Sequence, residues 1–140
     1  MIIKQISVFV ENRPGRLAEI TAMIAGCGVN IRALSIADTS HFGIMRCIVD
    51  KPEVTEAVLR NAGLTVAITD VIGLRIPDCP GGLAEALKFL ADKGFTVEYA
   101  YAFIEKTEND AYVVLRIDDA ERAVKVLKAN GYKGAEPSKQ

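Results

Sequence analysis

An internal repeat limits what this chain can fold into more than any other feature of its sequence. A shift of 66 positions carries the phrase "RPGRLAEI", which ends at Ile20, onto "CPGGLAEA", which ends at Ala86. Farther along, the shift grows to 68, because the second copy has two extra residues in a turn around 105–110. Other identical pairs are Ala25 with Ala91, Gly28 with Gly94, Asp50 with Asp118, Glu53 with Glu121, Val58 with Val126, Leu59 with Leu127, and Gly63 with Gly131. The repeat therefore predicts two similar units in tandem.

Both copies predict the same order of secondary structure. Alternating apolar residues over 6–10 predict a strand, and the spacing of Leu17, Ile20 and Ile24 predicts a helix. Gly28 and Gly94 follow the last turn of the first helix in each copy, where a left-handed residue ends a helix. The remaining elements are expected as strands at 30–37, 42–49, 96–104 and 111–117, and as helices at 53–61 and 120–130. A closing strand at 65–69 completes βαββαβ in the first copy, and a weaker one is expected at 132–134 in the second.

Composition and charge exclude several classes of protein. Half of the 140 residues are hydrophobic and 25% are charged, as in globular proteins. The net charge of −1 provides no global field toward nucleic acid or anionic membranes. We expect a cytoplasmic protein, because no signal peptide is recognisable and no apolar run approaches the roughly 18 residues of a spanning helix. The cysteines Cys27, Cys47 and Cys79 form no CxxC, so we expect free thiols and no metal site.

The turn before the first helix is the strongest candidate for a binding site. Pro14 is expected inside the first helical turn, because its missing N–H would have no partner there. Arg13 would then be a poor N-cap, and the amides of residues 15–17 would lack a side-chain acceptor. Free amides at the positive end of a helix dipole can bind a carboxylate or phosphate, and Gly15 allows close approach. The alternative is that Asn12 caps these amides itself.

The phrase "ENRPGRLAEI" with "GVNIRAL" downstream resembles the ACT domain, an amino-acid-sensing module of metabolic enzymes. The second copy, "PDCPGGLAEAL" with "GFTVEYA", is similar to the same family, so the chain is identified as a tandem ACT-domain protein. The resemblance implies an α+β, ferredoxin-like fold with antiparallel sheets and helices on one face. The expected domains are residues 1–69 and 70–134, and the polar residues 135–140 are expected to form a disordered tail.

The resemblance also implies where a ligand binds. In this family, ligands lie at interfaces between paired units, where turn amides and an asparagine of the second strand hold the backbone groups of an amino acid. The matching residues are Asn12, Arg13, Pro14, Gly15, Arg16, Leu17 and Asn30 in the first copy, and Asp78, Cys79, Pro80, Gly81, Gly82 and Leu83 in the second. Asp78 could pair with an α-ammonium group or cap the helix instead. Thr96 replaces the asparagine in the second copy, which leaves open whether both copies bind.

Other classes of protein that share the βαββαβ order fit the sequence less well. RNA-recognition modules need basic and aromatic residues on the first and third strands, and metal-transfer domains need a CxxC. An acylphosphatase-like site needs an arginine in a glycine-rich anion loop, and the surroundings of Arg13 and Arg16 do not match it. We therefore expect a non-catalytic, stand-alone regulatory protein that binds a free amino acid, forms a homodimer and needs no cofactor. Two alternatives remain: a regulatory subunit of a separate metabolic enzyme, similar to the small subunit of acetolactate synthase, and a small enzyme of unknown activity.

Overall fold

The chain divides into two compact units. The computed structural model describes residues 1–38 and 41–137. The N-terminal unit comprises Lys4–Thr69, and the C-terminal unit comprises Asp70–Glu136 together with Met1–Ile3. The division falls inside strand β4 (Val66–Pro77), so the chain passes from one unit to the next without a loop. No helix among the described residues is long and apolar enough to cross a membrane.

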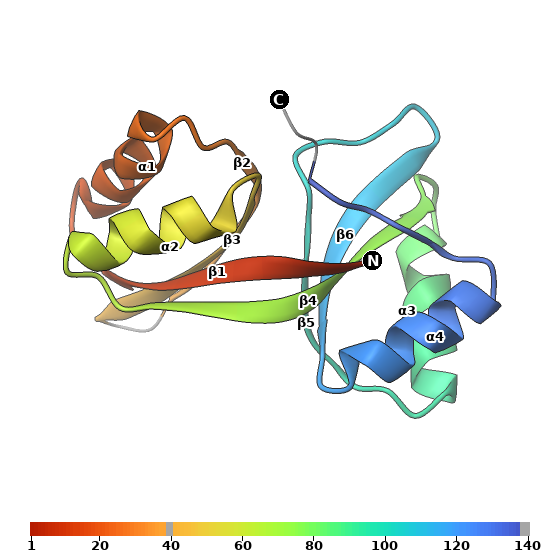
Figure 1. Ribbon diagram of the computed structural model, residues 1–140. Helices are drawn as coiled ribbons and strands as arrows, with labels where there is room; N and C mark the ends of the chain where they lie inside the picture. Colours follow the sequence, from red (N-terminus) through yellow and green to blue (C-terminus); the bar gives the residue numbers. More distant parts are fainter. Residues whose placement is uncertain (39–40, 138–140) are drawn as a thin grey trace. The chain divides into compact units, whose positions relative to one another are not determined.

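The N-terminal unit has the predicted βαββαβ order. Its elements are β1 (Ile2–Glu11), α1 (Arg16–Gly26), β2 (Ile31–Asp38), β3 (Phe42–Val49), α2 (Pro52–Asn61) and the first part of β4. The strands lie in the order β2-β3-β1-β4, and β3 is antiparallel to both β1 and β2. Both helices lie on one face of this sheet (Figure 1). The ferredoxin-like fold expected for this copy is confirmed.

The C-terminal unit repeats the arrangement. After β4 come α3 (Gly82–Asp92), β5 (Val97–Ala102), β6 (Asp110–Ile117), α4 (Ala120–Ala129) and β7 (Lys133–Gly134). The strand order is β5-β6-β4-β7, which is the order of the first unit. The closing strand β7 is short and pairs only with Leu74 and Arg75 of β4, which confirms the weak strand expected at 132–134.

Each unit has its own hydrophobic core, built from positions that the repeat relates. Ile6, Val8 and Val10 of β1 alternate into the first core, as Ile72, Leu74 and Ile76 of β4 do in the second. The helices add Ile20 and Ile24 to the first core, and Ala86 and Leu90 to the second. Full burial of a large aliphatic side chain contributes roughly 1.5–3 kcal/mol, so the period-two pattern of these strands fixes which face carries the helices.

The end of the described chain differs from the expected disordered tail. Ala135 is buried, and its amide donates to the carbonyl oxygen of Gly73 at 3.0 Å. The N-terminal ammonium group of Met1 pairs with Glu136 at 3.3 Å. Order therefore extends to Glu136, because the backbone continues past β7 along β4. The rest of the predicted tail, residues 138–140, lies outside the described residues.

Candidate functional site

The Pro-Gly phrase forms a type II turn before α1. Pro14 occupies the second position of the turn, and Gly15 occupies the third with φ 82° and ψ −10°. The Arg16 amide donates to the carbonyl oxygen of Arg13 at 3.3 Å and closes the turn. Only glycine adopts this third position without strain, and proline favours the second. The phrase is therefore explained by turn geometry, and both residues are exposed.

The helix begins later than predicted. Pro14 lies in the turn, and α1 begins at Arg16 with Gly15 as its N-cap. The reason is the positive φ of Gly15, which separates the proline from the helix. The Arg16 amide is thereby satisfied, and the bare amides are those of Leu17 and Ala18. Neither donates to an acceptor within the part of the chain that the structure describes.

Asn12 does not cap α1, so this alternative is wrong. Among the described residues, no side chain caps the helix, and the Asn12 amide donates to the carbonyl oxygen of His41 at 3.1 Å. This bond joins the start of the turn to the connection after β2. The two amides at the start of α1 are therefore left available for a ligand.

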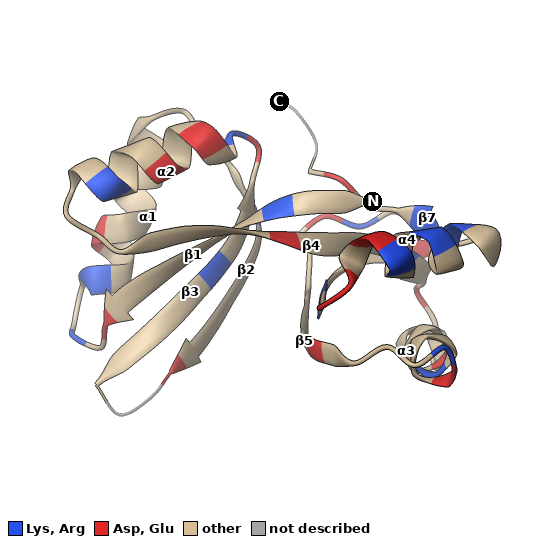
Figure 2. Ribbon diagram, turned by 60° about the horizontal axis from the view of Figure 1, so that its bottom comes forward, with Lys and Arg blue, Asp and Glu red and all other residues tan. Residues whose placement is uncertain are grey.

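Charged residues of both signs surround the N-terminal turn (residues 12–17), as Figure 2 shows. The Arg13 guanidinium lies 3.3 Å from the Glu11 carboxylate and 3.6 Å from that of Glu19. The Arg16 guanidinium lies 3.0 Å from Glu19 and 3.9 Å from Glu11. The turn amides thus lie next to a cluster whose charges are internally paired, so neither arginine is an isolated cation.

A pocket of about 370 Å³ opens beside this turn, and we name it the turn pocket. Its lining residues are Val10, Asn12, Leu17, Ile36, Asp38 and Gly43. Two of them, Asn12 and Leu17, were predicted from the sequence. Asp38 was missed, although its carboxylate is the only charged group among the described residues that line the pocket. It lies at the end of β2, which the parallel course of β1 and β2 brings beside the end of β1.

Asn30 lies at the other end of the same sheet. It directly precedes β2, and its amide donates to the Asp50 carboxylate at 3.0 Å. The turn pocket lies beyond the eight residues of β2, or roughly 26 Å away at about 3.3 Å per residue. Asn30 and the N-terminal turn of one unit therefore do not meet in a single site.

The C-terminal turn (residues 78–83) is also a glycine turn closed by a backbone hydrogen bond, but its side chains differ. Gly81 has φ 89°, and the Gly82 amide donates to the carbonyl oxygen of Cys79 at 3.1 Å. The Asp78 carboxylate accepts from the Lys106 ammonium group at 3.1 Å and does not cap α3. Pro80, Cys79 and Leu83 are exposed, as is Thr96 just before β5.

A second pocket, of about 430 Å³, lies in the C-terminal unit, and we name it the Gly82 pocket. Its lining residues are Arg75, Ile76, Pro77, Gly82, Glu85, Asp110, Asn130, Gly131, Tyr132 and Lys133. Only Gly82 among these was predicted as a site residue. The pocket could not be predicted from the sequence, because its lining comes from four separate segments of the chain.

The chemistry of these sites suits binding. In the described part of the chain, no group of three His, Cys, Asp or Glu side chains could hold a metal ion. His41 is exposed and offers its backbone carbonyl to Asn12. Burial raises the pKa of the Cys47 thiol to about 12, which leaves it neutral and unreactive in the first core.

Comparison with known proteins identifies the family. A model of the ACT domain pair matches residues 1–135, and the chain belongs to this family. Its domains are regulatory rather than catalytic. The solved structure of protein BT0572 from Bacteroides thetaiotaomicron is 39% identical, with a TM-score of 0.89, over 95% of this chain and 91% of that one.

More distant structures share the fold alone. The ligand-free regulatory subunit of aspartate kinase from Thermus thermophilus has a TM-score of 0.68 at 16% identity, over 92% of this chain and 94% of that one. Aspartate kinase from Synechocystis has a TM-score of 0.62 at 23% identity, over 99% of this chain but 28% of that one. No curated protein matches the chain at a significant level.

Proposed function

We propose that the chain is a non-catalytic regulatory protein that binds a free amino acid in the turn pocket of the N-terminal unit. The observation that carries the proposal is the coincidence of three features in one place. These are the free amides of Leu17 and Ala18, the side chains of Asn12 and Asp38, and a pocket of about 370 Å³ that Asn12, Leu17 and Asp38 line. Pockets of this size suit small ligands.

The polar groups of the turn pocket suit the two charged ends of an amino acid. The amides at the start of α1 suit an α-carboxylate, because they lie at the positive end of the helix dipole. The Asp38 carboxylate suits an α-ammonium group, and it forms no ion pair with any described residue. The apolar lining from Val10, Leu17 and Ile36 would contact the ligand's side chain.

Asn30 enters this proposal through a second copy of the chain. Its side chain makes no hydrogen bond within the described residues, and it lies too far from the turn of its own unit. In a homodimer, Asn30 of one copy would approach the turn pocket of the other. A ligand that contacts both copies would bind the dimer more tightly than the monomer. This difference in affinity sets how far the ligand shifts the equilibrium toward the dimer. Regulation would follow from that change of assembly.

The test is a thermal-shift screen of the full chain against the twenty amino acids, followed by calorimetry. A ligand at about 100 times its dissociation constant stabilises the folded state by about 2.7 kcal/mol. We expect one chemical class of amino acid to bind, and Asp38→Asn to weaken it by about tenfold or more, because a charged hydrogen bond is lost.

Asp78→Asn is the matched control, because it removes the same charge from the other turn. It should leave the affinity unchanged. Equal weakening by both substitutions would contradict the assignment to the turn pocket. Absence of binding by all twenty amino acids would contradict the sensor function and favour the regulatory-subunit alternative, in which a co-purifying catalytic chain is the partner.

A further inference from the structure

The repeat aligns Arg16 of the first unit with Gly82 of the second. Each is the first residue of its helix, α1 or α3. The Arg16 side chain is folded inward: it is only 15% exposed, and its Nε atom is buried. The carboxylates of Glu19 and Glu11 lie 3.0 and 3.9 Å from its guanidinium nitrogens. The first unit therefore holds a guanidinium of its own between the end of β1 and the start of α1.

In the C-terminal unit no side chain occupies the corresponding position. Gly82 has no side chain, and the Gly82 pocket of about 430 Å³ lies beside it. A Cβ atom at this position would overlap the carbonyl oxygen of Pro77, so the local backbone leaves no room for a side chain. The guanidinium that Arg16 supplies in the first copy has no counterpart in the second.

One of the two carboxylates that hold this guanidinium is nevertheless retained, whereas Glu11 is replaced by Pro77. Glu85 lines the Gly82 pocket and is the repeat counterpart of Glu19. It forms no ion pair with any described residue. The pKa of Tyr132, which lines the same pocket, is raised first by burial and then by the negative charge of Glu85. Glu85 is thus an unneutralised carboxylate beside the pocket.

Three further charged residues of this pocket have no charged counterpart in the first copy. Arg75, Asp110 and Lys133 also line it, and the repeat aligns them with the uncharged residues Phe9, Phe42 and Thr65. None of the three charged side chains forms an ion pair with a residue in 1–38 or 41–137.

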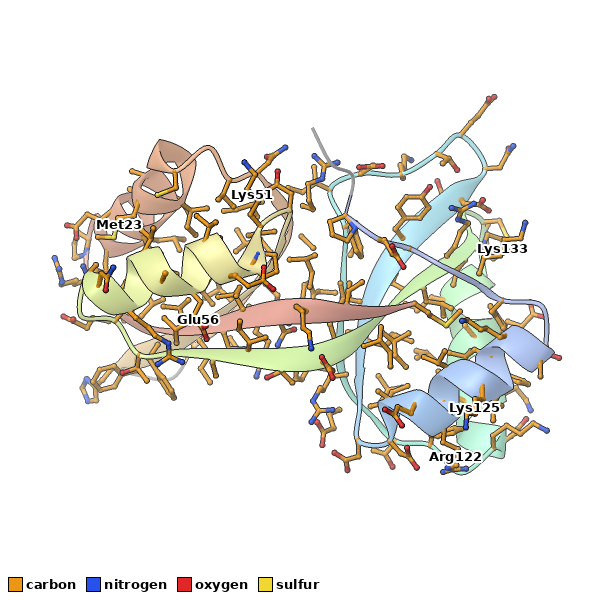
Figure 3. The ribbon with its side chains drawn as sticks, viewed as in Figure 1. Met23, Lys51, Glu56, Arg122, Lys125 and Lys133 are labelled. Carbon is orange, nitrogen blue, oxygen red and sulfur yellow. The ribbon has the colours of Figure 1, made fainter. Side chains whose placement is uncertain are left out.

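Two of these groups are cationic. The Nε atom of Arg75 is buried and has no acceptor in the described chain. Lys133, labelled in Figure 3, belongs to β7 and pairs through its backbone with Arg75. A buried donor without a partner costs free energy, which a bound anionic group would recover.

We propose that the Gly82 pocket binds a small molecule with a guanidinium group and a carboxylate, of which free arginine is the simplest. The guanidinium would lie beside Glu85, as that of Arg16 lies beside Glu19, and the carboxylate beside Arg75 and Lys133. Planar guanidinium groups bind carboxylates in two-pronged geometry, which favours them over a point charge. This site lies within one unit and is independent of the turn pocket.

The test is calorimetric titration of L-arginine into the full chain and into two matched variants. Glu85→Gln removes the charge from the Gly82 pocket and should weaken binding by about tenfold or more. Glu19→Gln removes the same charge from the N-terminal unit and should leave binding unchanged. Both residues are exposed helix positions, so both variants should fold. Citrulline, which lacks the guanidinium charge, and agmatine, which lacks the carboxylate, should each bind more weakly than arginine.

Three results would overturn the proposal. The first is no arginine binding up to a dissociation constant of about 1 mM. The second is an unchanged affinity in Glu85→Gln. The third is loss of arginine binding in Asp38→Asn with binding retained in Glu85→Gln, which would assign arginine to the turn pocket. The two pockets are tested with different variants. Failure of arginine to bind the Gly82 pocket therefore does not decide the function proposed for the turn pocket, which the Asp38→Asn experiment tests.

Discussion

At the scale of single residues, two turn glycines determine where the helices begin. Gly15 and Gly81 have φ values of 82° and 89°, and each precedes its helix directly. A Cβ atom added at either position would meet no atom within 4 Å. Their requirement for glycine therefore comes from backbone conformation alone. In α1 it leaves the amides of Leu17 and Ala18 without an acceptor among the described residues.

Gly15→Ala should destabilise the protein by about 1–2 kcal/mol, the cost of a left-handed conformation for a residue with a Cβ atom. Gly26→Ala is the control, because Gly26 lies in the same helix with open space around it and no positive φ. That substitution should stabilise the protein by roughly 0.5–1 kcal/mol. Urea unfolding measures both. Equal midpoints for the two variants would refute the strain argument.

Cys47 provides a prediction that depends on pH. Burial raises the pKa of its thiol from 9.0 to about 12, so the folded state keeps the proton that the unfolded state loses. Its contribution to stability is complete below pH 9 and falls as pH rises from 9 toward 12. In native protein at pH 8, a thiol reagent should modify the exposed Cys27 and Cys79 and spare Cys47. Rapid modification of three thiols in the folded protein would contradict this.

At the scale of elements, one of the four helices begins with a side-chain cap and three do not. Helices α1 and α3 follow Pro-Gly turns and have no side-chain cap. Helix α4 instead has Asp119 as its N-cap, and the Asp119 carboxylate accepts from the Arg122 amide at 3.3 Å. Helix α2 also lacks a side-chain cap and begins with Pro52, so a missing cap does not by itself mark a ligand site.

Asp119→Ala should destabilise the protein by about 1 kcal/mol, the usual cost of a lost N-cap. The neighbouring Asp118→Ala removes the same charge from an exposed residue that caps no helix, so it should change stability little. Thermal unfolding of both variants measures the difference. If both lose equal stability, net charge rather than capping is responsible.

At the scale of the whole molecule, the duplication explains both what the sequence predicts and what it does not. The repeated strand and helix patterns predict the fold, because period-two and helical spacing determine which residues enter each core. The start of α1 was predicted wrongly, since proline suits both a first helical turn and the second position of a type II turn. Asp38 was missed because only the register of the strands brings it near the turn. The Gly82 pocket was missed because its lining comes from four separate segments of the chain. The two copies keep one order of strands and helices and differ in the charges of the side chains around the turns.

The central claim is that the first amides of α1 bind the carboxylate of a free amino acid. It is tested most directly by following the backbone amide resonances of the full chain during titration with the amino acid found in the screen. The account predicts that the resonances of Leu17 and Ala18 shift downfield in a saturable manner, because their N–H groups gain a charged acceptor. Leu83 and Ala84, their counterparts in α3, are the internal control. Saturable binding that leaves Leu17 and Ala18 unshifted would contradict the account.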